Sequence, residues 1–474
     1  MTSRSPTPLP PALSLACRSC AFALVLLALA GFRHHLVWGE SSPLGFRLRP
    51  WLDAGETACL VGFAWFGTRG WLAAIAAVRE RTPGPDALLR ATLPLLLLAI
   101  LVPPFLSADV ADYVMRGRVL ALHGGNPYVH VATDFPNDPF LAFGDAGWKQ
   151  FPLPYGPLVA YLQGACAWLA DAVGAPLPLR AQFVLAVALL KAVFAVALLG
   201  SAVIARGIHE RLRSGGGDVA FVVIAWCPLL LNEALASAHN EALLLLTILA
   251  AVHGAVAGRF GLAAFAVGLG VLTKIVPVLM APLLLAWALR AGRLRAFTAG
   301  ALAAGGIAAL LAWRFFSDPG SLDFLRRQSE VTSVSIAWTA ASLLGIETAT
   351  AVTAGRVVVV AVVAWAALRL WRRPSGDELL GGAAAVFAAM AFFGVAGFGL
   401  WYHVWWAPLA LLAGPGFFSR FAVAVCWLSP LGYVWWTAAR RLDDPHQVTA
   451  LVLGVLLPAA WALRARRALV VPPG

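Results

Sequence analysis

Charged residues are scarce in this sequence of 474 residues, in which Asp, Glu, Lys and Arg together make up 12%. Globular domains carry roughly 25% charged residues. Hydrophobic residues make up 61% and the mean hydropathy is +0.81, so a soluble enzyme would expose too much apolar surface and a disordered chain is excluded. The apolar runs are long and do not alternate, which excludes a membrane barrel built from alternating strands. The composition predicts an all-α, polytopic integral membrane protein, because backbone polar groups in lipid must be satisfied within helices.

Cysteines and nucleotide-binding signals are also sparse. The six cysteines are scattered, and the close pair Cys17 and Cys20 has no second pair that would complete a zinc site. The sequence contains no Walker loop, no glycine-rich dinucleotide motif and no HExxH helix. No cofactor is therefore indicated, and a divalent metal is left open. The net charge of +12 would suit nucleic acid. Because the arginines flank apolar runs, the positive-inside rule explains that charge and no nucleic-acid partner is predicted.

Apolar windows of about 20 residues can cross a bilayer. The sequence predicts about fourteen such spans, at 19–38, 54–78, 89–107, 180–205, 219–237, 241–257, 261–277, 279–291, 296–315, 353–371, 380–398, 404–419, 421–438 and 446–463. The run at 156–174 is also apolar, but a crossing there would move the arginines of 206–213 to the outer side. We therefore predict a juxtamembrane or re-entrant helix at 156–174.

The expected organisation is one transmembrane domain over 1–474. Residues 1–88 contribute additional N-terminal helices, and 108–175 form an outer loop with an acidic surface helix followed by the juxtamembrane helix. A second outer loop covers 316–350.

Four polar clusters interrupt the apolar pattern. The first follows the third span, where Asp109, Asp112, Arg116 and His123 fall on one face of a short predicted helix. Paired acids next to a guanidinium suit acid–base chemistry, but a solvated face of an interfacial helix would look the same.

The second cluster lies at an outer membrane boundary and runs from Asn232-Glu233 to His239-Asn240-Glu241. If one helix continued through this stretch, Asn232 and His239 would share a face, because they are seven residues apart. Ionisable groups at membrane depth are costly and are therefore functional candidates. The alternative is a polar turn that holds only water.

The third cluster is Lys274, near the outer end of an apolar helix, which could extend to the interface or bind a phosphate. The fourth is the aromatic run that begins at Trp401, which is either an interfacial belt or a platform for a sugar. In the second outer loop, Arg326 and Arg327 could also bind a phosphate.

These motifs together resemble the bacterial glycosyltransferases of the GT-C fold that use polyprenyl-phosphate sugars, and most closely the membrane mannosyltransferases. The matching residues occur in the following order: Ser107-x-Asp109-x-x-x-Tyr113-x-x-x-Gly117-Arg118, Gly125-Asn126-Pro127-Tyr128, Tyr155-Gly156-Pro157-Leu158, His239-Asn240-Glu241-Ala242-Leu243, Leu272-Thr273-Lys274-x-x-Pro277, and Trp401-Tyr402-x-x-Trp405 with Pro408. The sequence departs from many relatives in having Ala108-Asp109 where they have paired acids. Whether Asp109 acts alone or with Asp112 is therefore open.

The resemblance implies transfer of mannose from a polyprenyl phosphate to a hydroxyl of a glycan or glycolipid acceptor, at the outer face of the bacterial inner membrane. Inversion needs one base, for which Asp109 is the first candidate and Asp112 the second. The implied ligands of the donor phosphate are Arg116, Lys274, His239, Arg326 and Arg327. The residues implied in positioning the sugar or the outer loop are Asn126, Tyr128, Tyr155, Asn232, Asn240, Glu241, Trp401, Tyr402 and His403. The scheme requires no metal, although some members of the wider fold use one.

Two other functions stay open at this point. A transporter or lipid-linked sugar flippase would also need many helices, but it predicts internal symmetry and broken helices near the midplane. A polysaccharide ligase would also act on lipid-linked sugars outside the cell. The glycosyltransferase hypothesis predicts that five side chains lie close together in space: Asp109, His239, Glu241, Lys274 and Tyr402.

Overall fold

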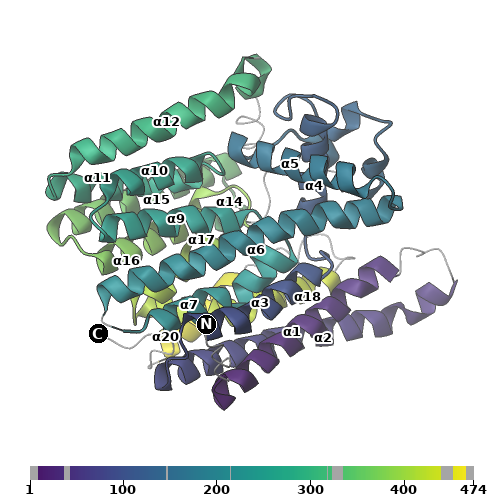
Figure 1. Cartoon of the computed structure of the whole chain (residues 1–474), viewed down its shortest axis with the longest axis horizontal. Coiled ribbons are helices and arrows are strands. Elements are labelled where there is room, and N and C mark those ends of the chain that lie inside the picture. The colour runs from purple at the N-terminus through teal and green to yellow at the C-terminus, as the bar shows by residue number, and fades with distance from the viewer. Residues whose placement is uncertain are drawn as a thin grey trace, which may run out of the picture. The chain divides into compact units, whose positions relative to one another are not determined.

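The computed structural model describes residues 9–36, 43–145, 148–213, 215–317, 319–322, 335–438 and 452–465. Within these residues every regular element is a helix, and no strand occurs (Figure 1). The all-helical fold class is therefore confirmed. Contacts divide the chain into two compact units, which are described separately below.

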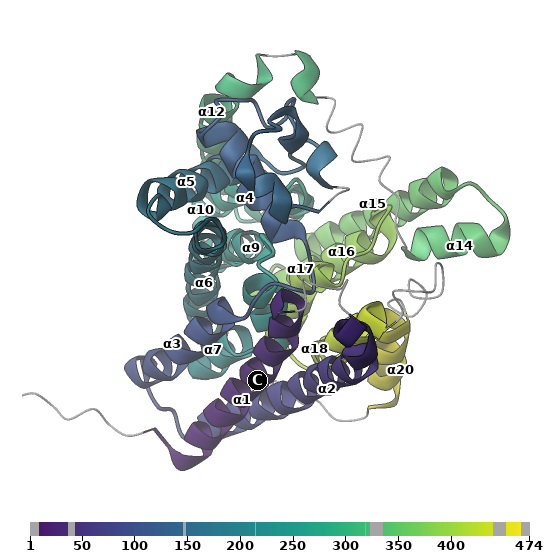
Figure 2. The same cartoon turned by 90° about the vertical axis from the view of Figure 1, so that its right-hand side faces the viewer.

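The first unit comprises Met1–Pro103, Leu198–Ala236 and Ala407–Gly474. Its helices α1 and α2 lie side by side along much of their length (Figure 2). Small residues allow this approach, since a side chain on Gly70 would meet the sulfur of Cys20 at 2.9 Å. The elements of this unit are α1 (Pro11–Leu36), α2 (Pro43–Glu80), α3 (Pro85–Leu101), α7 (Gly217–Ala225), α8 (Pro228–Leu230), the π-helix η4 (Leu231–Ala236), α18 (Phe417–Ala438), the π-helix η9 (Val452–Leu456) and α20 (Leu457–Arg464).

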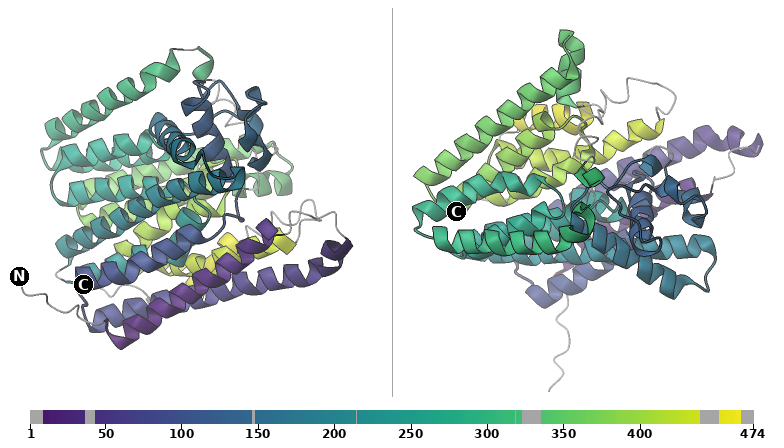
Figure 3. Two further views of the ribbon diagram at one scale, coloured as in Figure 1. Left: turned by 45° about the vertical axis from the view of Figure 1, so that its right-hand side comes forward. Right: turned by 90° about the horizontal axis from the view of Figure 1, so that it is seen from above.

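The second unit comprises Pro104–Ala197 and Ser237–Trp406. In it, α10 packs against both α9 and α12, and these helices run alongside one another in two further views (Figure 3). Its elements are α4 (Asp109–Ala121), η1 (Ala132–Asp134), η2 (Pro139–Phe143), η3 (Trp148–Gln150), α5 (Pro157–Gly174), α9 (Glu241–Val256), α10 (Phe260–Val271), η5 (Val276–Met280), α11 (Ala281–Arg290), α12 (Leu294–Phe316), η6 (Pro319–Leu322), α14 (Ile336–Leu344), α15 (Thr348–Arg372), α16 (Gly376–Ala389), the π-helix η7 (Met390–Gly394) and η8 (Leu400–Tyr402). Two helices belong partly to each unit, namely α6 (Leu179–Leu212) and α17 (His403–Ala413).

Helices occupy all fourteen of the predicted spans, but many are shorter than a bilayer requires. Seven described segments are long and apolar enough to cross a membrane: Pro11–Gly31, Asp53–Glu80, Leu179–Leu212, Gly217–Ala236, Leu294–Phe316, Thr348–Arg372 and Gly376–Gly394. Three further apolar helices are shorter. The chain is therefore a multi-pass membrane protein, and seven of its described segments qualify as spans by this measure, compared with the predicted number of about fourteen. The helix α5 is not among the seven, and its juxtamembrane position stays a prediction, as does the single transmembrane domain.

The short helix predicted after residue 107 is present as α4, but it is not a surface helix. Every residue from Val110 to Leu120 is buried, Asp112 and Arg116 included. The cause is α5, which packs so closely on α4 that a side chain on Gly117 would overlap the backbone carbonyl of Gln163. The expectation of a solvated polar face on this helix is therefore wrong.

The predicted helices at 219–237 and 241–257 are also present, but the chain between them does not continue as one helix. The π-helix η4 ends at Ala236 and α9 begins at Glu241. Between them Ala238 has a φ of 59°, in the left-handed region that a non-glycine residue rarely adopts. The shared helical face of Asn232 and His239 is therefore not formed.

Candidate active site

Asp109 lies at the start of α4 and faces the break before α9. Its Oδ2 is 3.9 Å from Nε2 of His239, and 16% of its side chain is exposed, whereas His239 is fully buried. The imidazole ring of His239 stacks on Trp401, with ring centroids 4.5 Å apart and an interplanar angle of 27°. Three segments that are distant in the sequence thus meet at this carboxylate.

The left-handed backbone at Ala238 sets the position of this histidine. Among the described residues, Ala238 is the non-glycine residue with a positive φ. Such a conformation costs on the order of 1–3 kcal/mol, and it persists where the surrounding structure enforces it. Here it directs the chain out of η4 so that His239 and Glu241 follow in quick succession.

Lys274 lies in the turn between α10 and η5 and contacts Glu241 and three aromatic rings. Its Nζ is 2.6 Å from Oε1 of the buried Glu241. The ring centroids of Tyr155, Tyr402 and Trp405 lie 5.4, 5.2 and 5.2 Å from the same nitrogen. A carboxylate and aromatic faces both favour the charged ammonium. With 16% of its side chain exposed, Lys274 presents that charge to an approaching molecule.

Tyr155 reaches Lys274 because two distant segments share backbone hydrogen bonds. The N–H of Gly156 donates to the carbonyl of Thr273 at 2.9 Å, and the N–H of Leu158 donates to that of Leu272 at 3.1 Å. A side chain on Gly156 would overlap the Leu272 carbonyl, so this approach requires glycine. We call this contact the Gly156 junction.

Asp112 and Arg116 form a buried ion pair one turn further along α4. Burial raises the pKa of the Asp112 carboxyl to about 7, and nearby Asp109 and Asp145 add to the rise, although Arg116 opposes it. Asp112 is less accessible than Asp109, because only 6% of its side chain is exposed. The base and phosphate-binding roles of Asp112 and Arg116 stay predictions.

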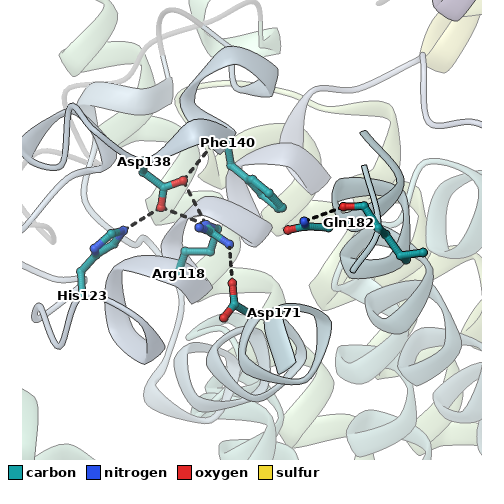
Figure 4. A network of polar contacts seen from close by, with 7 residues as sticks. Arg118, His123, Asp138, Phe140, Asp171 and Gln182 are labelled. Atoms are coloured by element: carbon teal, nitrogen blue, oxygen red, sulfur yellow. Dashed lines mark hydrogen bonds and ion pairs between the residues drawn. The ribbon is translucent and has the colours of Figure 1, made fainter. Parts of the chain in front are cut away.

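A second polar network ties the loop after α4 to that helix (Figure 4). The Nε of Arg118 donates to both oxygens of Asp138, at 3.1 and 2.9 Å, and Nε2 of His123 lies 2.6 Å from Oδ2. The backbone N–H of Phe140 donates to the same carboxylate, and the Arg118 guanidinium lies over the Phe140 ring. Arg118 is also 3.6 Å from Asp171 on α5. Burial alone would raise the pKa of Asp138, but the hydrogen bonds from Arg118, His123 and Phe140 outweigh it and lower that pKa. We call this network the Asp138 clasp.

Asn126 and Tyr128 make contacts that fit a role in positioning the loop over 126–155. The Asn126 amide donates to the Phe315 carbonyl and to Oγ of Ser321, both at 2.9 Å. The Tyr128 hydroxyl donates to the Tyr155 carbonyl at 2.8 Å, and its ring packs against Phe315.

The remaining predicted residues are more dispersed. Asn240 is buried, and its amide nitrogen has no hydrogen-bond partner. His403 is buried among aromatic rings and accepts a hydrogen bond from Nε1 of Trp406. In the first unit, Asn232 donates to Glu233, which also accepts from the Tyr433 hydroxyl. Arg326 and Arg327 lie outside the described residues.

Two site residues were not predicted. Trp405 is buried, contacts Lys274 and stacks on Tyr402 with centroids 4.1 Å apart. The hydroxyl of Tyr113 lies 3.2 Å from that of Tyr155. Both belong to motifs that the sequence displays, and the signal that could have found them is helical spacing. Trp405 follows Tyr402 by three residues and Tyr113 follows Asp109 by four.

The predicted convergence is present within the second unit. Direct contacts join Asp109 to His239, and Lys274 to Glu241 and Tyr402. In the part of the chain that the structure describes, no three His, Cys, Asp or Glu side chains are grouped so that they could hold a metal ion.

The chain matches a known protein family. Residues 20–291 match the family described as alpha-(1->6)-mannopyranosyltransferase, N-terminal domain. The match includes Asp109, His239, Glu241 and Lys274, and it ends before the aromatic run at Trp401. No curated protein sequence matches the chain. Because the match covers more than half of the chain, this membrane protein belongs to the alpha-(1->6)-mannopyranosyltransferase family and is a glycosyltransferase.

Proposed function

We propose that the chain transfers a mannosyl residue from a polyprenyl-phosphate donor to a hydroxyl of a glycan or glycolipid acceptor, with inversion and formation of an α-1,6 linkage. We further propose that the reaction takes place at the outer face of the bacterial inner membrane. The observation that carries this proposal is the pair of accessible charges at one site. Asp109 and Lys274 are each 16% exposed, while their partners His239 and Glu241 are buried.

The carboxylate of Asp109 suits removal of the acceptor proton, and the ammonium of Lys274 suits departure of the phosphate. Asp109 accepts the proton of the acceptor hydroxyl as its oxygen bonds to the anomeric carbon. The bond from that carbon to the phosphate oxygen breaks, and the lipid phosphate leaves with the bonding electrons. Lys274 neutralises the charge that develops on this phosphate. A single base suffices, because a phosphate leaves without protonation by a second acid.

His239 lies beside the base, and its stacking on Trp401 fixes the ring plane. The donor phosphate gains a second partner if this imidazole is protonated. The rings of Tyr155, Tyr402 and Trp405 limit water around Lys274, which strengthens its attraction to phosphate.

Transfer from labelled polyprenyl-phosphate-mannose, measured in membranes at equal expression, tests the proposal. Asp109→Asn is expected to lower the rate by about 10²–10⁴-fold, the contribution typical of a general base. Asp112→Asn is the matched variant on the same helix and should retain most of the activity. Transfer by Asp109→Asn but not by Asp112→Asn would assign the base to Asp112 instead. No transfer by the wild type from any of several lipid-linked sugars would overturn the proposed donor.

A further inference from the structure

The outer loop at 126–155 carries two exposed aromatic side chains. Trp148 is 37% exposed and Phe151 is 39% exposed, and their rings meet edge to face with centroids 5.8 Å apart. In the described part of this loop, Val129 is the other large hydrophobic side chain with comparable exposure. Large apolar side chains that face solvent together on a polar loop mark an interaction surface.

Hydrogen bonds hold the short segment that carries the two rings. The carboxylate of Asp145 accepts a hydrogen bond from the Trp148 N–H at 3.2 Å, and the Asp145 carbonyl accepts one from Lys149. The N–H of Phe151 donates to the Trp148 carbonyl at 3.1 Å. The Asp138 clasp anchors the preceding part of the loop to α4 (Figure 4). The rings are therefore presented at a low cost in conformational entropy.

Short stretches of chain connect the aromatic pair to the candidate active site. Gly144 packs so closely on α4 that a side chain there would overlap the sulfur of Met115. The charge of Asp145 acts on Asp112 of the same helix. Phe151 precedes Tyr155, which contacts Lys274, by only four residues, so their Cα atoms are at most about 14 Å apart.

We propose that Trp148 and Phe151 form a platform on which a sugar unit of the acceptor glycan stacks, beyond the unit whose hydroxyl is glycosylated. This inference rests on the proposed function, because it takes the acceptor to be a glycan. The C–H face of a pyranose ring packs on an aromatic face, which buries apolar surface without desolvating the hydroxyls at the ring edge. Gln150 is exposed and lies between Trp148 and Phe151 in the sequence, and its amide is suited to bind those hydroxyls.

The charge of the loop favours a glycan over a bilayer as the occupant. The loop carries the carboxylates of Asp134, Asp138 and Asp145 against the single lysine Lys149. Segments that bind anionic membranes carry clusters of Lys and Arg. A neutral oligosaccharide meets no repulsion from the loop.

Acceptor binding by the full chain in phosphatidylcholine nanodiscs tests the platform without the donor. Titration calorimetry with α-1,6-linked mannotetraose should show a dissociation constant about tenfold higher for Trp148→Ala, Phe151→Ala and Trp148→Leu than for the wild type. Trp148→Phe should stay within about threefold of the wild type, because it keeps an aromatic face. Trp313→Ala removes a tryptophan that is 82% exposed on α12 and serves as the matched control; it should bind like the wild type.

Kinetics separate a platform from a merely structural role. The KM for mannotetraose should rise about tenfold in Trp148→Ala, while kcat, the KM for the donor and the KM for methyl α-mannoside stay within about twofold. An equal loss with both acceptors, or full function in Trp148→Leu, would indicate a bilayer anchor and overturn the platform. Absence of mannotetraose binding by the wild type would overturn it as well. If the wild type binds mannotetraose but transfers nothing from polyprenyl-phosphate-mannose, the proposed function fails and the platform stands.

Discussion

The ammonium of Lys274 lies 2.6 Å from the carboxylate of Glu241, although 33 residues separate them in the sequence. The carboxylate is buried and the ammonium is partly accessible. Removing one member of a buried ion pair leaves the other charge uncompensated, which costs about 3–5 kcal/mol, whereas removing both can be neutral.

The pair therefore predicts different outcomes for stability and for activity. Lys274→Met should lower both the thermal midpoint in detergent and the rate of transfer. Lys274→Met combined with Glu241→Gln should recover most of the midpoint but not the rate, because the cation that we propose as the partner of the donor phosphate is still missing. Arg369→Met breaks an ion pair whose arginine is 48% exposed, and it should change the midpoint little. Full transfer by the double variant would show that Lys274 has no role beyond pairing with Glu241.

The Gly156 junction predicts that one added methyl group disrupts the site. Gly156→Ala forces the 155–158 segment away from Leu272, so Tyr155 withdraws from Lys274. We expect a destabilisation of about 1–3 kcal/mol from overpacking and a clear loss of transfer. Gly306→Ala on α12 adds the same methyl group where no atom lies within 4 Å, and it should be neutral or slightly stabilising. Thermal midpoints and transfer rates of the two variants should differ; equal values would contradict the proposed tight contact.

The Asp138 clasp predicts a stabilisation that depends on pH. The pKa of Asp138 is lowered in the folded protein, so its contribution is present above the ordinary carboxyl range of about 4 and is lost as the pH falls through the lowered value. The wild type should exceed Asp138→Asn in thermal midpoint near pH 6, and the difference should shrink below about pH 4. Asp171→Asn, which alters a carboxylate that is 49% exposed, should have little effect at either pH. A difference that grows on acidification would show that the carboxylate is not stabilised in its charged form.

The order of the helices could be predicted because each span is a separate apolar run, and this pattern requires no knowledge of partners. The burial of α4 could not be predicted, because the helix itself is polar and is buried by close packing on α5 at Gly117. The interruption of the helix before His239 could not be predicted either. It depends on the left-handed backbone at Ala238, and alanine carries no sequence signal for that conformation.

The sequence predicts which residues form the candidate site better than it predicts which residues they contact. The sequence predicts that Asp109, His239, Glu241, Lys274 and Tyr402 lie together. Contacts join Asp109 to His239 and Lys274 to Glu241 and Tyr402, and Trp401 links the two groups by packing on both His239 and Tyr402. The partners of Lys274 and Arg118 could not be predicted, because pairing across 33 or 20 residues is set by how loops close. Arg118 is an example of a partner that the sequence does not predict. The sequence places it in a motif with Gly117, and the structure pairs it with Asp138, 20 residues away.

The Gly156 junction also has a consequence for biosynthesis. Gly156 and Leu272 are 116 positions apart, and α9 and α10 lie between them in the sequence. At typical synthesis rates of 5–20 residues per second, the loop over 126–155 is made several seconds before the backbone at Leu272 and Thr273, to which its end is hydrogen-bonded. The candidate active site can therefore form only after the chain up to about residue 273 has been synthesised. A chain that stops before residue 272 would contain Asp109 but could not complete the surroundings of Tyr155, so formation of the candidate site requires that these later helices have been inserted.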